Sequence, residues 1–265
     1  MANWPALRSL TFNDIPMPGF ELQTNPLFPD HTLTSLISLP FLRNLEISDD
    51  LYGCSLPIFT SAKLPSLRSL SYTFDPSAYK GHPFDAIVAA YSHLTELTLI
   101  VLSCSRDRHL SDFLSHLASL QQLRVVNITL RTELQTYNAN DLRTLLAMWP
   151  ALVELRIAVR DYDEDPDNDI RPPFDVLPEL AGAFPALRVL HLPRTVLVPG
   201  TLDAARRAGV APHRSLYDLR IGLVVVRGRR DDSRDEEAKR EVRTFLNALF
   251  PMAGHRVKVE TNPAV

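Results

Sequence analysis

Residues 149–157 read Trp-Pro-Ala-Leu-Val-Glu-Leu-Arg-Ile, in which an aromatic-proline pair precedes the pattern Leu-x-x-Leu-x-apolar. Variants of this motif, most of them with a proline before the first leucine, recur along the whole chain. Because proline prevents a helix from running directly into the motif, the pattern favours a turn followed by a short strand. The first leucines of the eight copies are residues 7, 42, 67, 94, 123, 152, 187 and 216.

Segments with apolar residues at helical spacing alternate with these predicted strands. Ser111 and Asn140 are predicted N-caps, because their side-chain oxygens can accept hydrogen bonds from the free amides of a first helical turn. One unit of helix, turn and strand cannot bury its own apolar face, whereas stacked units can. The sequence therefore predicts an α/β fold with a parallel sheet on one side and helices on the other. The predicted helical segments are residues 32–38, 84–91, 111–118, 141–148 and 174–183.

The repeated motif resembles that of the leucine-rich-repeat family, and the resemblance covers nearly the whole chain. It implies that residues 1–265 form a single horseshoe solenoid of about eight to nine irregular repeats, with a concave parallel sheet and convex helices. The form apolar-Pro-x-Leu-Arg-x-Leu is similar to the repeat half of fungal F-box proteins. In those proteins an N-terminal helical box docks on a ubiquitin-ligase adaptor, and the repeats capture a substrate.

The C-terminal residues 233–265 are predicted to close the solenoid with a capping helix and a last strand that begins at Gly254. Ser233 and Glu236 fit a capping box at the start of this helix, and Glu236 is spaced to pair with Arg240. The stripe that the helix is expected to bury consists of Val242, Phe245, Leu246, Leu249 and Phe250.

The composition excludes several classes of protein. With 28 basic and 31 acidic residues the net charge is −3, so there is no overall basic field to attract nucleic acid. No signal-peptide pattern and no long apolar stretch is present, so we expect a cytoplasmic or nuclear protein that does not bind membranes. Cys54 and Cys104 lack the spacing of a zinc site and are predicted to be reduced thiols.

No motif for catalysis, cofactor binding or metal binding is recognisable. The patterns GxSxG, HExxH, GxxxxGK[ST] and GxGxxG are absent from the sequence. The acidic run Asp161–Asp169 lacks the glycine and the closing glutamate of a calcium loop, and is expected to be a solvated loop. We therefore predict a binding protein with no catalytic residue, no cofactor and no metal site.

The candidate binding residues are those at the middle of each predicted strand, since side chains alternate between the two faces of a sheet. This middle row starts neutral to acidic and becomes basic in its C-terminal half, where Glu154 and Asp218 partly offset the arginines. Arg156, His191, Arg220 and Lys258, with Glu154 and Asp218, are the predicted partner-binding residues of the concave face. Lys258 belongs to this set if the last strand stacks in register. The full row is Thr11, Glu46, Ser71, Thr98, Asn127, Arg156, His191, Arg220 and Lys258.

The expected function is protein interaction, because a solenoid presents a rigid surface at little entropic cost. The basic half of the row favours a protein partner with an acidic or phosphorylated segment. The family resemblance implies an F-box-like substrate receptor or a truncated relative of one. The sequence shows no F-box, since it begins at Trp4-Pro5 inside a repeat, so a ubiquitin-ligase adaptor is expected only if an F-box lies upstream. The alternative is a leucine-rich-repeat GTPase activator, with Arg156 or Arg220 acting on a partner's nucleotide site.

Overall fold

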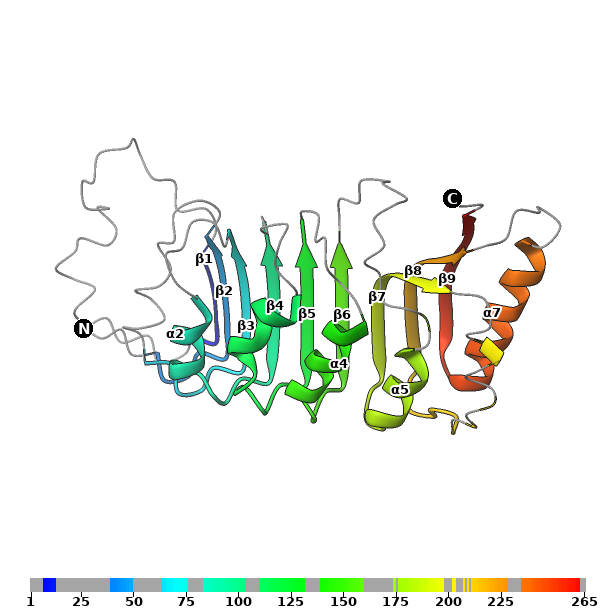
Figure 1. Cartoon of the computed structure of the whole chain (residues 1–265). Helices are drawn as coiled ribbons and strands as arrows, with labels where there is room; N and C mark the ends of the chain where they lie inside the picture. Colours follow the sequence, from blue (N-terminus) through cyan, green and yellow to red (C-terminus); the bar gives the residue numbers. More distant parts are fainter. Residues whose placement is uncertain are drawn as a thin grey trace.

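The structure is a computed structural model whose described part is built from repeating units of strand and helix (Figure 1). Successive units lie side by side, so that the first strands and the last helix are at opposite ends of the molecule. The described residues are 7–12, 39–49, 63–75, 83–102, 110–131, 139–159, 174, 176–197, 202–203, 207, 209, 211–227 and 235–262.

One parallel sheet organises the molecule, with nine strands in the described residues whose spatial order is the same as their order in the sequence. From β1 to β8 the register pairs each copy of the motif with the next copy, position by position. The predicted α/β fold with a parallel sheet is confirmed, and its stacking is compatible with a repeat solenoid. The strands are β1 (Ser9–Phe12), β2 (Asn44–Asp49), β3 (Ser69–Phe74), β4 (Glu96–Val101), β5 (Val125–Leu130), β6 (Glu154–Val159), β7 (Val189–Leu197), β8 (Asp218–Arg227) and β9 (Gly254–Asn262).

The helices of the described residues lie on one face of this sheet (Figure 1). Four of the five predicted helical segments are confirmed, and the fifth, residues 32–38, lies outside the described residues. The helices are α2 (Pro83–Ala90), α3 (Leu110–Leu114), continued by the 3₁₀ turn η2 (Ser115–Leu117), α4 (Ala139–Met148), α5 (Val176–Ala183) and α7 (Asp235–Leu249).

The second apolar position of the motif forms one row through the sheet. Each member is the register partner of the next, and the members from β2 to β8 are buried. Leu10 is only partly buried, because β1 pairs with β2 alone in the described part of the sheet. This row is the centre of the hydrophobic core that joins sheet and helices. It consists of Leu10, Leu45, Leu70, Leu97, Val126, Leu155, Leu190 and Leu219.

The turns before β2 to β7 each close with the same kind of backbone hydrogen bond, such as Leu152 N–H to the Trp149 carbonyl at 3.1 Å. In the turn before β8 a side chain takes the place of that carbonyl, because Leu216 N–H donates to Nδ1 of the buried His213 at 3.1 Å. The other ring nitrogen of His213 lies 2.6 Å from the Phe184 carbonyl of the preceding turn. His213 therefore connects two successive repeats.

The prediction that Ser111 and Asn140 are N-caps is wrong. Both are the second residue of their helix, since α3 begins at Leu110 and α4 at Ala139. The Ser111 hydroxyl instead donates to Asp141 Oδ1 at 2.6 Å, and Ser111 N–H donates to the same oxygen at 3.2 Å. Asp141 is only 1% exposed, so this contact between neighbouring helices supplies two hydrogen bonds to a buried carboxylate.

The C-terminal elements agree with the sequence in outline. All five residues of the predicted stripe are buried, four of them in α7 and Phe250 directly after it, and β9 begins at Gly254 as expected. Ser233 lies outside the described residues. Glu236 forms its ion pair with Lys239 at 2.6 Å, three residues along the helix, and not with Arg240 as the i,i+4 spacing predicted.

Candidate functional site

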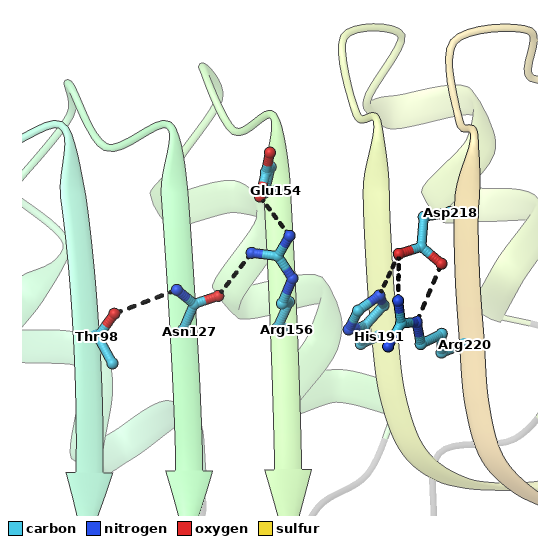
Figure 2. Close-up of polar contacts among 7 residues, drawn as sticks. All are labelled: Thr98, Asn127, Glu154, Arg156, His191, Asp218 and Arg220. Carbon is cyan, nitrogen blue, oxygen red and sulfur yellow. Dashed lines mark hydrogen bonds and ion pairs between the residues drawn. The ribbon is translucent and has the colours of Figure 1, made fainter.

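The middle row of the sheet is brought together as the sequence predicted for β1 to β8. Thr11, Glu46, Ser71, Thr98, Asn127, Arg156, His191 and Arg220 are successive register partners. They alternate along each strand with the core residues, so they belong to the face opposite the helices. Figure 2 shows the C-terminal part of this face, where the polar side chains form two groups in front of the strands.

The first group links three strands. Asn127 donates through Nδ2 to Thr98 Oγ1 at 3.2 Å and accepts through Oδ1 from Arg156 Nη1 at 3.2 Å. Arg156 Nη2 also lies 2.7 Å from Glu154 Oε2, two residues earlier in the same strand. The Arg156 side chain is 36% exposed and that of Glu154 24%, so the pair lies at the surface, and the hydrogen bond to Asn127 orients the guanidinium.

The second group lies on β7 and β8. Asp218 accepts from Arg220 through two contacts, Nε at 3.2 Å and Nη2 at 3.1 Å, and its Oδ2 lies 3.0 Å from His191 Nε2. Burial lowers the pKa of His191, although the neighbouring Asp218 opposes this shift. Burial alone would raise the pKa of Asp218, but the hydrogen bonds from Arg220 and His191 outweigh it and lower that pKa. The group therefore favours a neutral imidazole beside a charged carboxylate.

These contacts neutralise the predicted basic half of the row. Arg156 is matched by Glu154, and Arg220 by Asp218, each within one strand. Among the described residues no hydrogen bond or ion pair joins the two groups, which lie on either side of the short β6–β7 ladder with its three register pairs. Arg156 and His191 are nevertheless register partners in that ladder, and the charge of Arg156 also lowers the pKa of His191. To act as an arginine finger on a partner's nucleotide site, Arg156 or Arg220 would have to break its ion pair with the neighbouring carboxylate. The arrangement is suited to hydrogen bonding with a polar partner surface, since neither arginine–carboxylate pair presents an excess of one charge.

The register of β9 differs from the prediction. Arg220 is paired with Arg256, so Arg256 and not Lys258 holds the ninth position of the middle row. Lys258 lies two residues further along β9, where the register with β8 shifts between Ile221 and Val224. β9 does not carry a copy of the motif, and His255 is the register partner of the core residue Leu219. The motif therefore gave no leucine from which the register of β9 could be counted.

A second row of side chains, one position before each strand, was not considered in the sequence analysis. We call it the edge row. Each member accepts through its carbonyl from the backbone N–H of the next, as in the bonds from Arg43 N–H to Arg8 O at 2.9 Å and from Arg68 N–H to Arg43 O at 2.8 Å. The signal was present in the motif, since an arginine follows the first leucine in five of the eight copies. The edge row consists of Arg8, Arg43, Arg68, Thr95, Arg124, Val153, Arg188 and Tyr217.

Other kinds of site receive no support from the described residues. No group of three or more histidine, cysteine, aspartate or glutamate side chains within them could hold a metal ion. No helix in the same part of the chain is long and apolar enough to cross a membrane. Cys54, Cys104 and the acidic run Asp161–Asp169 lie outside the described residues, so their predictions stay predictions.

Comparison with known proteins gives little. No protein-family model matches the chain, and no curated protein matches it. Among solved structures the chain is similar to a Bacteroides fragilis protein determined by a structural-genomics consortium. The two are 15% identical, the match covers 77% of this chain and 68% of that one, and the TM-score is 0.31. Function has to be argued from the residues themselves.

Proposed function

We propose that the chain is a leucine-rich-repeat protein-interaction module that binds a partner protein on the sheet face opposite the helices. The observation that carries this proposal is the middle row, whose side chains are aligned by eight registered strands and fixed by hydrogen bonds between strands. Such a surface is ordered before a partner arrives, so little entropy is lost when it binds. The repeat motif and the parallel stacking of its copies support the family assignment.

The C-terminal half of this face is the proposed contact surface. Arg156, Glu154, His191, Asp218 and Arg220 present donors and acceptors side by side (Figure 2). An acidic or phosphorylated segment would bind here by sharing the guanidinium groups with Glu154 and Asp218. Charged contacts of this kind set specificity and association rate more than affinity.

A substrate-receptor role in a ubiquitin ligase is the biological form of this proposal that the motif's similarity to F-box proteins suggests. It requires an F-box connected to these repeats. A binding assay between a purified ligase adaptor and the full-length gene product tests it directly, and failure to bind would restrict the proposal to a free-standing interaction module.

The test of the binding face is a pair of matched charge reversals. Proteins recovered from a cell extract by the wild-type chain are compared with those recovered by Arg156→Glu with Arg220→Glu, and by the control Glu46→Lys with Glu96→Lys. We expect the C-terminal variant to lose a specific partner that the control retains. Loss in the control alone would move the contact to the N-terminal half of the face, and retention in both would refute binding on this face.

A further inference from the structure

The turns that precede the strands lie along one edge of the sheet, because the amino ends of parallel strands point the same way. Figure 1 shows these turns along the lower edge of the molecule. The edge row fixes their spacing, since each member is hydrogen-bonded through the backbone to the next strand. Neighbouring positions are therefore about 4.8 Å apart, the separation of strands in a sheet.

This edge has a charge opposite to that of the whole protein. Its described residues carry six arginines and one lysine, all exposed, and no aspartate or glutamate, whereas the net charge of the chain is −3. The edge residues in question are 7–8, 39–43, 63–68, 91–95, 118–124, 149–153, 184–188, 211–217 and 250–253, and their cations are Arg8, Arg43, Lys63, Arg68, Arg124, Arg188 and Arg214.

Most of the edge arginines have no internal side-chain partner in the described part of the chain. Among the described residues, Arg8, Arg43, Arg124 and Arg188 have no side-chain hydrogen bond or ion pair, and Arg68 donates only to the His93 carbonyl at 3.3 Å. Guanidinium groups without a carboxylate partner have donors that can bind an anion in bidentate geometry. Arg8, Arg43 and Arg68 directly precede three adjacent strands, which places three such groups within about 10 Å along the edge.

Exposed apolar side chains lie on the same edge. The large hydrophobic residues that are most exposed in the described part of the chain are Phe41 at 54%, Tyr217 at 54% and Met252 at 65%. All three lie in the turns of this edge, and Tyr217 is itself a member of the edge row. Arginine, tyrosine, phenylalanine and methionine are the residue types enriched in protein interfaces, where lysine, aspartate and glutamate are depleted.

We infer that the amino-terminal edge of the sheet is a second binding surface, and that it takes an acidic segment of a protein partner. Carboxylates of the segment pair with the row of free guanidinium groups, and apolar residues of the partner contact Phe41, Tyr217 or Met252. A protein segment fits better than nucleic acid, because a short acidic stretch covers only the edge. A long polyanion would also meet the rest of a protein whose net charge is −3.

The test uses a fluorescein-labelled, glutamate-rich peptide and fluorescence anisotropy, at low and at physiological ionic strength. The edge variant is Arg43→Glu with Arg68→Glu. Its matched control is Arg240→Glu with Arg243→Glu, which makes the same change in charge at two exposed positions of α7. We expect the peptide to bind the wild type, with an affinity that falls as salt rises, and the edge variant to bind it about tenfold more weakly or worse. The control should bind like the wild type.

Several results would overturn the inference. They are absence of peptide binding by the folded wild type at low salt, an edge variant that binds unchanged, and an equal loss in the α7 control. Tighter binding of a single-stranded RNA of equal charge, lost in the edge variant, would show that the edge serves nucleic acid instead. Circular dichroism and thermal melting confirm that each variant is folded. Arg156→Glu with Arg220→Glu is measured with the same peptide, to distinguish this surface from the proposed sheet-face site. Loss of peptide binding in the edge variant alone supports the edge, and loss in the sheet-face variant alone places the peptide on the sheet face.

Discussion

The arginines of the sheet face and those of the edge have opposite electrostatic surroundings: the first are paired with carboxylates and the second are not. Arg156 and Arg220 lie inside strands, where the residue two positions earlier is on the same face and is a carboxylate. Arg43 and Arg188 lie one position before a strand, where the neighbouring turns contain no carboxylate in their described residues. Place within the repeat thus decides whether an arginine is neutralised internally or left to attract an anion.

This difference separates two tasks. The paired arginines position a hydrogen-bonding surface whose charges are balanced, so it discriminates by geometry. The free arginines create a local positive potential, which raises the rate of encounter with acidic partners and weakens with salt. One partner could meet the edge first and be selected on the sheet face afterwards.

The largest expected effect is a loss of stability when the core row that positions both sets of arginines is disrupted. Leu155→Ala should lower the free energy of unfolding by about 2–5 kcal/mol, because a fully buried leucine in the central part of the core row leaves a cavity. Urea denaturation followed by circular dichroism measures it. Ala158→Ser, at an exposed position of the same strand, serves as the control and should change stability by less than about 0.5 kcal/mol. A loss below about 1 kcal/mol for Leu155→Ala would contradict the buried row.

The electrostatic difference between the two sets of arginines should disappear when Arg156 and Arg220 lose their carboxylate partners. Glu154→Gln with Asp218→Asn removes both carboxylates, so the sheet face should bind anions more strongly than it does in the wild type. Affinity for the glutamate-rich peptide should then rise about threefold to tenfold at low salt, since each exposed pair is worth up to about 1 kcal/mol. Glu236→Gln with Glu237→Gln, two exposed residues of α7, makes the same change in net charge. An equal rise in that control would mean that only net charge matters.

The two sets of arginines should also differ in their contribution to the free energy of unfolding, by a smaller amount. Arg156→Gln should cost about 0.2–1 kcal/mol, because the pair with Glu154 is partly exposed and screened by solvent. Arg43→Gln should leave the free energy of unfolding unchanged, since the Arg43 side chain has no partner among the described residues. Chemical denaturation of both variants provides the measurement. A loss of about 2 kcal/mol or more at Arg43 would reveal a structural role at the edge.

The smallest effect concerns the protonation of His191. Its pKa is lowered by burial and partly restored by Asp218, so Asp218→Asn should lower the pKa further. In both proteins the folded chain holds the His191 proton less tightly than the unfolded chain does. The contribution of His191 to the free energy of unfolding should therefore decline as pH falls below about 6.5, and should level off below the lowered pKa. A titration of the imidazole C–H signals by NMR gives the pKa in both proteins. A rise on substitution would show that the carboxylate does not stabilise the imidazolium.

The register of eight strands was predictable because the repeated leucines mark the same position in every copy. Once Leu155 and Leu190 are aligned, Arg156 and His191 follow by the alternation of side chains along a strand. The ninth strand could not be placed in this way, since a histidine, His255, and not an apolar residue is the register partner of Leu219, and a register shift follows. Counting from the apolar residues of β9 therefore put Lys258 where Arg256 lies.

Contacts between repeats were the part that the sequence did not reveal. Ser111 has the side chain of an N-cap, yet it lies inside α3 and bonds to Asp141 of the next repeat, which no local pattern encodes. The ion pairs of Arg156 and Arg220 follow from the i,i+2 spacing of charges, but the link through Asn127 depends on the register of two strands. The edge row was visible in the motif, but its positions lie just outside the strand interiors from which the binding face was predicted.

His213 has a consequence for how the molecule responds to force. Its ring joins the turn before β8 to the turn before β7, and its backbone N–H donates to the Leu249 carbonyl at the end of α7 at 2.7 Å. One residue thus ties three consecutive parts of the chain. When the C-terminus is pulled, α7 and the turn before β8 should detach in one step of the extension trace, while the repeats before β7 are released singly.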